Sequence, residues 1–490
     1  MLNQVSSRIT KFENTGAHRN EIDMPELISS LSYALDLTEG AVPGHALRSC
    51  ILGMRIAERA GLPQDQMSDL YYALLLKDIG CSSNAAHMSR IVDGGDDARR
   101  AEVQAAVQAQ VWADIRAEFQ AEMDRAEAEK RQTPKLLRSL WGRSETPKIA
   151  IAPAPVEPMR LTSYRSSRKE IKLHGDRGAS IIGKIGLGVG TAEAVRALDE
   201  HWDGSGYPGR WRGERIPLLA RIAAVAQHLD VFASEGGPES AIVILRERSG
   251  KWFDPEIVRI AVSLHRSRLL WKDCLAVLPE QDIRSAVLGL EPRENLHLGP
   301  DRIDRVCEAF SDVTDAKSPF TVEHSMGVAD AALLIAQTMG LSVERTVFVR
   351  RAALLHDLGK LRVPNSILHK RGKLTVEEFL IVKEHPALTS KILARIPAFR
   401  EMAHVAGSHH EKLDGTGYPN QLASQDLSLE ARIVAVADVY AALSEERPYR
   451  ESLDLNQVTS IMSKEVGPKL DHVCFDALLY GLRQNVAVRA

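Results

Sequence analysis

The chain has 490 residues, which is enough for two or three domains that each bury a core of their own. Its 44% hydrophobic and 26% charged residues are typical of a globular protein, and with a formal net charge of -3 nothing indicates DNA or a membrane surface as the main partner. The five cysteines are dispersed without a Cys-x-x-Cys pair, which excludes a zinc ribbon and indicates a reducing compartment. No apolar run approaches the ~20 residues of a membrane span, so we expect a cytoplasmic protein.

The first predicted elements are helices. Residues 26–60 place apolar side chains at helical spacing, and Gly61-Leu62-Pro63 ends this region. The polar, aperiodic residues before it are typical of a loose tail. The next apolar run ends in residues 73–80, with the sequence ALLLKDIG.

A segment between about residues 88 and 167 interrupts the helical pattern. Its first part, about 97–131, is rich in Ala, Glu, Gln and Arg with apolar residues at helical spacing, which predicts one long exposed helix. Its second part, from Ile149 onward, contains several prolines and is typical of a flexible connector. This helix is either a solvated spacer or a surface that docks a partner or forms a homodimer.

An internal repeat organises the chain, because three spacings recur in both halves. His45 is as far from Lys77 as His324 is from His356, His174 is as far from Leu198 as His385 is from His409, and Leu198 is as far from Gln227 as His409 is from Asp438. The offset between the halves is smaller after the interruption than before it, so the first half carries an insertion. We therefore expect a first domain over residues 1–265, a linker over 266–298 and a second domain over 299–490.

The second half contains a His-Asp pair at the end of an apolar run. Residues 352–360 are AALLHDLGK, so an imidazole and a carboxylate are adjacent and an ammonium follows one turn later. A pair of metal ligands beside a cation that can contact phosphate favours hydrolysis of a phosphate ester. The dipeptide alone is common, so this interpretation depends on the downstream residues.

Residues 409–419 are HHEKLDGTGYP, in which two adjacent imidazoles are followed by a turn-forming loop. With these motifs the sequence resembles the HD-GYP family, phosphohydrolases of the HD superfamily that cleave cyclic dinucleotides. The resemblance runs from about Asp301 to the C-terminus. It implies an all-α protein of two tandem HD-type helical domains, of which the first carries a long helical insertion and the second is catalytic.

The resemblance and the register of the repeat imply seven metal ligands, namely His324, His356, Asp357, His385, His409, His410 and Asp438. Five imidazoles and two carboxylates without a thiolate suit two divalent transition-metal ions, with iron or manganese ahead of zinc. Asp357 is placed to bridge ions ~3.5–4 Å apart. Some relatives hold a third ion partly with a Glu one turn before the first histidine, but that position is Phe320 here.

Asp438 interrupts an otherwise apolar helix, so its carboxylate requires a cation. A metal ion is the expected partner, and a salt bridge to Arg432 or Arg447 is the alternative.

The resemblance also implies the reaction, in which a hydroxide that bridges the two ions attacks phosphorus and opens cyclic di-GMP to pGpG or onward to GMP. Asp357 and Lys360 are the predicted catalytic residues, because the ammonium can stabilise charge on the phosphoryl oxygens. The predicted substrate-binding residues are Lys360, Gly415, Gly417, Tyr418 and Arg450. The loop is equally well explained as a structural turn, and Arg450 as a surface ion pair.

The first half has lost most of the ligands. It keeps three of the seven positions and changes four, with His45, Asp78 and His174 retained and Lys77, Leu198, Asp199 and Gln227 at the others. A protonated lysine cannot bind a metal and leucine has no donor atom, although Glu200 or His201 could replace a ligand. The loop over residues 203–208, DGSGYP, is intact.

Two other functions remain open from the sequence. The chain could be chiefly an interaction protein, whose first half binds a partner such as a diguanylate cyclase or senses a ligand. It could also hydrolyse a hybrid cyclic dinucleotide, because nothing in the residues separates that substrate from cyclic di-GMP.

Overall fold

The computed structural model describes residues 22–39, 42–80, 164–274, 278–292, 298–317, 324–368, 370, 372–445 and 452–489. These residues form α-helices and short 3-10 helices, and the part of the chain described contains isolated bridges but no extended strand. The all-α prediction is therefore confirmed. The helix predicted over about 97–131 and the side chain of Arg450 lie outside the described residues.

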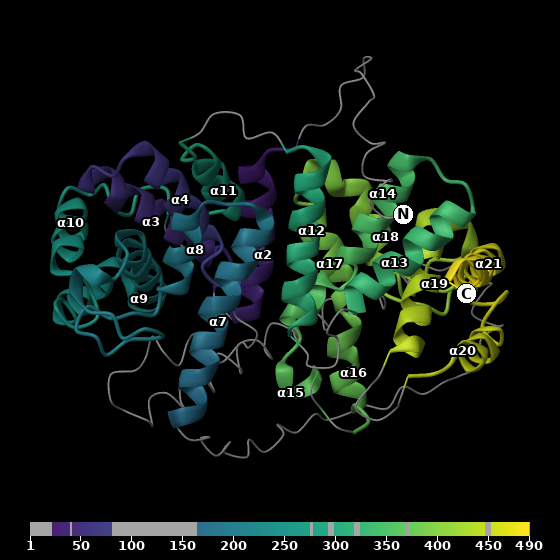
Figure 1. The fold of residues 1–490 in the computed structure, drawn as a ribbon. Helices are drawn as coiled ribbons and strands as arrows, with labels where there is room; N and C mark the ends of the chain where they lie inside the picture. The colour runs from purple at the N-terminus through teal and green to yellow at the C-terminus, as the bar shows by residue number, and fades with distance from the viewer. Residues whose placement is uncertain are drawn as a thin grey trace, which may run out of the picture.

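The first half fills the purple and teal side of the molecule (Figure 1). Its helices are α2 (Met24–Glu39), α3 (His45–Ala60), α4 (Gln64–Leu75), α7 (Tyr164–Ile185), α8 (Val189–Arg196), η2 (Gly213–Arg215), α9 (Leu218–Glu247) and α10 (Pro255–Arg266). Helix α3 ends at Gly61, whose φ of 74° lets its N–H reach back to the carbonyls of the last turn. Helix α9 is kinked at Gly237, directly before Pro238.

The second half fills the green and yellow side (Figure 1). Its helices are α12 (Pro300–Asp315), α13 (His324–Thr338), α14 (Val343–Leu355), η3 (Leu358–Arg362), α15 (Asn365–Leu368), α16 (Val376–Lys383), α17 (His385–Leu393), η4 (Pro397–Phe399), α18 (Arg400–Gly407), η5 (Ser424–Asp426), α19 (Leu429–Ser444), α20 (Leu455–Met462) and α21 (His472–Arg489). The hydroxyl of Ser428 caps α19 by accepting the N–H of Ala431.

The predicted linker contains a further helix, α11 (Glu280–Leu288). Ile283 and Val287 of this helix are buried, and α11 packs against α2 and α3 of the first half. The residues between the two expected domains are therefore partly built into the core of the first.

The repeat inferred from spacing recurs in the hydrogen bonds of the two halves. Asp36 accepts the N–H of Ala46, and at the equivalent positions of the second half Asp315 accepts the N–H of Ser325. Each aspartate fixes the start of the helix that carries the first histidine of its half, α3 or α13. The two halves thus position that histidine in the same way.

One hydrophobic core runs through both halves. Helix α2 contacts α17 and η3 of the second half, and α7 contacts α12 (Figure 1). Polar contacts reinforce this interface, because Lys184 Nζ lies 2.8 Å from Asp312 Oδ2 and Arg395 lies over the ring of Tyr33. No helix among the described residues is long and apolar enough to cross a membrane.

Candidate metal centre

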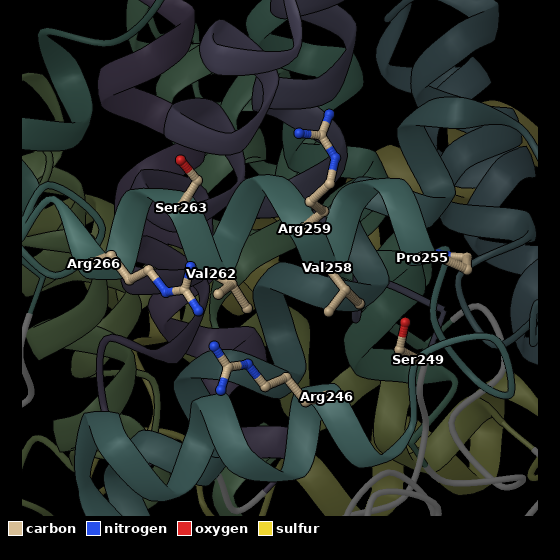
Figure 2. A pocket seen from close by; sticks show the side chains of 8 residues that line it. All are labelled: Arg246, Ser249, Pro255, Val258, Arg259, Val262, Ser263 and Arg266. Carbon is tan, nitrogen blue, oxygen red and sulfur yellow. The ribbon is translucent and has the colours of Figure 1, made fainter.

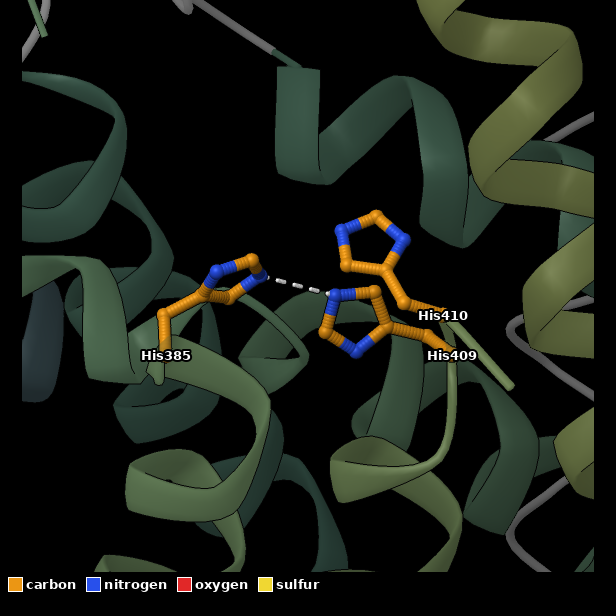
Figure 3. Close-up of side chains that lie close together, drawn as sticks. All are labelled: His385, His409 and His410. Carbon is orange, nitrogen blue, oxygen red and sulfur yellow. Dashed lines mark hydrogen bonds between the residues drawn. The ribbon is translucent and has the colours of Figure 1, made fainter. Parts of the chain in front are cut away.

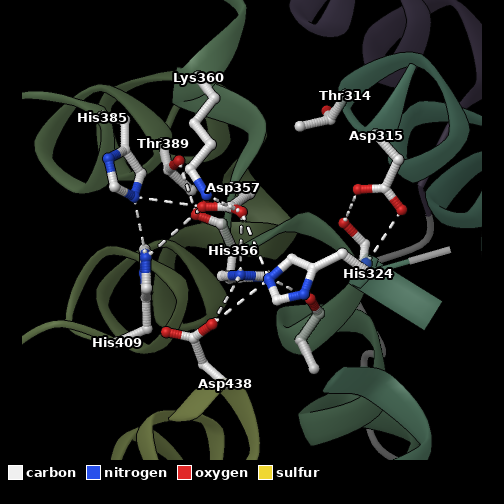
Figure 4. Close-up of polar contacts among 12 residues, drawn as sticks. Thr314, Asp315, His324, His356, Asp357, Lys360, His385, Thr389, His409 and Asp438 are labelled. Carbon is white, nitrogen blue, oxygen red and sulfur yellow. Dashed lines mark hydrogen bonds and ion pairs between the residues drawn. The ribbon is translucent and has the colours of Figure 1, made fainter. Parts of the chain in front are cut away.

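The predicted ligands come together in the second half, most of them at the ends of helices; Figure 4 labels six of them, and Figure 3 labels His410. His324 begins α13 and His385 begins α17, while His356 and Asp357 lie between α14 and η3. His409 and His410 follow α18, and Asp438 lies in α19. All are buried except His410, whose side chain is 25% exposed.

Asp357 lies at the centre of this group. Its Oδ1 is 3.2 Å from Nε2 of His385 and 3.7 Å from Nε2 of His409. Its Oδ2 is 3.3 Å from Nε2 of His356 and 3.8 Å from Nε2 of His324. One carboxylate therefore presents each of its oxygens to a different pair of imidazoles.

Asp438 is the second carboxylate of the group. Its Oδ1 is 3.4 Å from Nε2 of His324 and 3.8 Å from Nε2 of His356, and its Oδ2 is 3.6 Å from Nδ1 of His410. Since Arg432 pairs with Asp471, the alternative ion pair between Asp438 and Arg432 is not formed. Arg447, the other partner considered, lies outside the described residues.

Three groups of ligand atoms are compact enough for a metal ion, with all atoms of a group within 4.8 Å of one another. The first contains His324, His356 and Asp438, and the second contains His385, His409 and His410. The third joins these two through the central carboxylate, as His356, Asp357 and His409. In the second group Nε2 of His385 and Nε2 of His409 approach to 3.0 Å (Figure 3).

The backbone orients most of the imidazoles. In His356, His385 and His409, Nδ1 lies 2.6–2.7 Å from the carbonyl oxygen three residues earlier, which accepts its proton. Nε2 then faces the centre as an acceptor, which is the usual arrangement of metal-binding histidines. For His324 the partner is a side chain instead, because Nδ1 lies 3.0 Å from Oε2 of Glu445.

The charges of the residues fit a bound cation. Burial alone would raise the pKa of Asp357, but His356 and Lys360 hold it well below its usual value. Burial lowers the pKa of His385, of His409 and of His410, the last to about 3, so these imidazoles are neutral and can bind a metal.

Two buried polar atoms at the centre also point to a cation. Nε2 of His356 and Oδ1 of Asp357 are buried and make no hydrogen bond. Buried polar atoms are rarely left in that state, and metal ions at this centre would bind both atoms.

Thr389 on α17 connects the His-Asp pair to the helix that carries His385. Its hydroxyl donates to the carbonyl of His356 at 2.9 Å and accepts the N–H of Gly359 at 2.8 Å. A Cβ at Gly359 would lie 2.1 Å from the carbonyl oxygen of His385, so this close approach requires glycine. Sequence reasoning did not identify Thr389, because a threonine inside a helix carries no local signal.

The loop over residues 414–419 is held by Glu411. This buried carboxylate accepts the N–H groups of Asn420 at 2.7 Å and Leu422 at 3.0 Å. The ring of Tyr418 then lies 4.9 Å from the ring of His410, so the loop supports that predicted ligand. The glycines serve the turn, because Gly415 has a φ of 75° and a Cβ at Gly417 would lie 2.4 Å from the backbone of Glu411.

Lys360 is beside the predicted metal ligands and is not one of them. Its Nζ donates to Oδ2 of Asp357 (Figure 4), and its side chain is 23% exposed. The ammonium therefore lies between the buried carboxylate and solvent.

The equivalent centre of the first half contains a protein cation. Lys77 donates to Asp78, and both side chains are buried. Nδ1 of His45 lies 2.7 Å from Asp230, which also accepts Nε of Arg48 at 2.6 Å. Among the described residues of this half, no three side chains form a group that could hold a metal.

The two residues considered as replacement ligands have other roles. Glu200 accepts the N–H groups of Gly209 and Trp211, as Glu411 does for its own loop. His201 stacks on Trp252 with ring centroids 4.8 Å apart. The first half has therefore kept the loop and its anchor without the ligands.

A groove of about 590 Å³ lies elsewhere in the first half, between the end of α9 and α10 (Figure 2). Arg246, Arg259 and Arg266 line it, and none of the predicted site residues does.

Comparison with known proteins supports the assignment of the fold and chemistry. A family model described as HD domain matches residues 118–257 and 308–473. The chain is 35% identical over 461 residues to 3′3′-cGAMP-specific phosphodiesterase 3 of Vibrio cholerae, and the match covers 94% of this chain and 95% of that protein. It is 36% identical over 207 residues to the cyclic di-GMP phosphodiesterase response regulator RpfG of Xanthomonas campestris. This match covers 42% of this chain and 52% of that protein.

A solved structure agrees over almost the whole chain. The crystal structure of a cyclic GMP-AMP specific phosphodiesterase of Vibrio cholerae matches with a TM-score of 0.60 and 31% identity, over 95% of this chain and 98% of that one. The chain therefore belongs to the HD-domain family and is a phosphodiesterase of the HD-GYP type.

Proposed function

We propose that the second half hydrolyses a cyclic dinucleotide, with 3′3′-cGAMP as its preferred substrate. The observation that carries the chemistry is the central carboxylate of Asp357, whose two oxygens face different pairs of imidazoles. The substrate is supported by the relative named for 3′3′-cGAMP, which aligns over nearly all of both chains.

Two divalent ions, iron or manganese, are the proposed cofactors. His324, His356 and Asp438 would hold one ion, and His385, His409 and His410 the other, with Asp357 shared between them. When bound, the ions supply Lewis-acid stabilisation of the phosphoryl oxygens and an acidified water as nucleophile. The donor set, with five imidazoles and no thiolate, suits these metals.

The side chains beside the ligands bind and orient the substrate in this proposal. Lys360 offers an ammonium to a phosphoryl oxygen from the solvent side of the centre. The ring of Tyr418 packs against His410, and Nζ of Lys383 lies 4.8 Å from the centre of the Tyr418 ring. Arg450 would complete the substrate contacts with a guanidinium suited to phosphate.

Cyclic di-GMP is the second candidate substrate, with pGpG or GMP as the product. It was the expectation from the sequence motifs, and relatives named for it match shorter stretches of the chain. The same centre would cleave either phosphodiester, because the proposed ions and Lys360 would act on phosphate oxygens and not on bases.

We further propose that the chemistry resides in residues 299–490 and that residues 1–265 are not catalytic. The buried Lys77–Asp78 pair in the first half supports this division. The first half would then act as an interaction or sensing domain, for a partner such as a diguanylate cyclase or for a second copy of the chain.

The test of the proposed function is a substrate comparison with full-length protein purified without oxygen and loaded with Fe²⁺ or Mn²⁺. Equal concentrations of 3′3′-cGAMP, cyclic di-GMP and cyclic di-AMP are incubated with it, and the products are separated by chromatography. We expect the highest kcat/KM for 3′3′-cGAMP. A higher value for cyclic di-GMP would reverse the order of the two candidates, and cleavage of none would refute the function.

A further inference from the structure

The first histidine of each half is bound by a carboxylate, but from different positions in the chain. In the first half Nδ1 of His45 lies 2.7 Å from Oδ2 of Asp230. In the second half Nδ1 of His324 lies 3.1 Å and 3.0 Å from the two oxygens of Glu445. Both histidines therefore contact a carboxylate through Nδ1, but Asp230 and Glu445 are not at equivalent positions of the repeat.

The register of the repeat shows the displacement. In the alignment that places Gln227 at Asp438, Asp230 corresponds to Ala441, which has no polar atom in its side chain. Ala441 and Glu445 are one helical turn apart, and the N–H of Glu445 donates to the carbonyl of Ala441 at 3.1 Å. The second half therefore has its carboxylate one turn further along the chain, on a side chain that is one methylene longer.

Gly327 has no side chain, and this leaves space for the carboxylate of Glu445. In the alignment that places His45 at His324, Gly327 corresponds to Arg48. A Cβ at Gly327 would lie 3.2 Å from Oε1 of Glu445 and 3.9 Å from Cβ of Ala441. In the first half, Arg48 has its side chain here and pairs with Asp230. In the second half the carboxylate of Glu445 therefore lies beside Ala441, in the region that the Arg48 side chain fills in the first half.

We propose that Glu445 is a positioning residue for the metal centre, which replaces the carboxylate lost at Ala441 and fixes His324 with Nε2 toward Asp357 and Asp438. The proposal rests on the proposed function only in that it requires metal ions at this centre. By accepting the Nδ1 proton, Glu445 holds the tautomer in which Nε2 binds a metal.

The structure suggests a relocation test. An aspartate introduced by Ala441→Asp restores the residue found at the equivalent position of the first half, and Glu445→Ala removes the present carboxylate. The Mn²⁺ affinity of the full chain is then measured by titration without substrate for the wild type, Glu445→Ala, Glu445→Gln and the double variant Ala441→Asp/Glu445→Ala.

We expect Glu445→Ala to weaken Mn²⁺ binding about 10- to 100-fold, the usual cost of losing a partner of a metal-binding histidine. Glu445→Gln should lose less, because its amide oxygen still accepts the Nδ1 proton. The double variant should recover most of the affinity that Glu445→Ala loses, which a residue of merely structural importance would not produce. As a matched control, the exposed Asp476 on α21 is changed to Asn, and Mn²⁺ binding should stay at the wild-type value.

Two results would overturn the proposal. One is Mn²⁺ affinity within twofold of wild type in Glu445→Ala, and the other is a folded double variant that binds no more tightly than Glu445→Ala. If Glu445→Ala does not fold, Glu445→Gln and the double variant decide between the same outcomes. Normal Mn²⁺ binding by a wild-type protein that cleaves no cyclic dinucleotide would refute the proposed function and leave the role of Glu445 intact.

Discussion

Lys77 donates a hydrogen bond to Asp78 in the buried centre of the first half. In the second half the same two positions are His356 and Asp357. Nε2 of this imidazole lies 3.3 Å from Oδ2 of the carboxylate. A buried carboxylate requires a positive charge nearby. The first half supplies that charge with its own ammonium, whereas the second half leaves ligand atoms that a metal ion can bind.

The first prediction concerns this internal cation. Lys77→Met should destabilise the protein by about 3–5 kcal/mol, since it removes the ammonium from a buried ion pair and leaves the carboxylate. The free energy of unfolding in urea measures the effect. Lys77→Met/Asp78→Asn should recover part of the loss, and Lys370→Met, at a partly exposed pair with Glu378, should cause little change. Equal stability of Lys77→Met and wild type would contradict the prediction.

The second prediction concerns the shared carboxylate. Asp357→Asn should lower turnover by more than about 100-fold and release metal, because loss of a direct ligand should exceed the loss of an outer partner. Metal content and circular dichroism are measured on the same sample, and the helical signal should be unchanged. A variant that keeps both its metal and its activity would show that Asp357 is not a shared ligand.

The third prediction concerns Lys360. Lys360→Met should lower kcat about 10- to 100-fold at normal metal content, since the ammonium acts on the substrate and donates no ligand atom. Steady-state kinetics and metal analysis separate these effects. Loss of metal to the extent seen with Asp357→Asn would assign the ion pair of Lys360 and Asp357 a structural role instead.

The proposed ligands could be selected from the sequence because they adjoin motifs, as in HHEKLDGTGYP, or occupy equivalent positions in the repeat. The partners of these ligands were not predictable. Thr389 and Glu445 contact the centre only after α17 and α19 pack against it, so their neighbours in the sequence give no signal.

The expected linker shows a second limit of sequence patterns. Pro279 lies within the expected linker over residues 266–298, and it directly precedes α11 as its N-terminal boundary. Proline is well tolerated at the start of a helix, so the same residue is compatible with both interpretations. The burial of Ile283 and Val287 in the common core distinguishes them, and burial is known only from the structure.

The fourth prediction concerns pH. Burial opposes the charged form of His324, but hydrogen bonds to Asp438 and Glu445 outweigh it and raise its pKa to about 9. In the metal-free protein this histidine is therefore protonated at pH 7 and must lose a proton to bind a metal. Metal affinity should rise about tenfold per pH unit up to about pH 9. The raised pKa also stabilises the metal-free fold below the unfolded pKa of 6.5, and this contribution is lost as pH rises through 9.

Calorimetry in buffers of different ionisation enthalpy measures the protons released when Mn²⁺ binds at pH 7. We expect proton release from His324 and from His356, where burial is outweighed by the charge of Asp357, which raises the pKa. The neutral His385, His409 and His410 should release none. Binding without proton release, or affinity that is independent of pH between 6 and 8, would contradict this assignment.

The fifth prediction compares the two loop anchors. Glu411→Gln replaces one of the two accepting carboxylate oxygens with an NH2 group, which cannot accept a backbone N–H. The variant should therefore loosen the loop and raise KM several-fold while metal content stays normal. Glu200→Gln makes the same change in the first half and is the matched control. It should leave KM unchanged. Equal effects of the two variants on KM would place both loops in the substrate site.

The central claim is that one half of this chain holds a two-metal phosphodiesterase centre and the other half holds none. Metal analysis and product analysis of one anaerobically purified full-length sample test it directly, with His45→Ala and His324→Ala as paired variants of equivalent residues. We expect two divalent ions per chain and cleavage of a cyclic dinucleotide in the wild type and in folded His45→Ala, and loss of cleavage and of at least one ion in His324→Ala. Loss of metal and activity in folded His45→Ala with retention in His324→Ala, or a fully loaded wild type that cleaves no cyclic dinucleotide, would contradict the account.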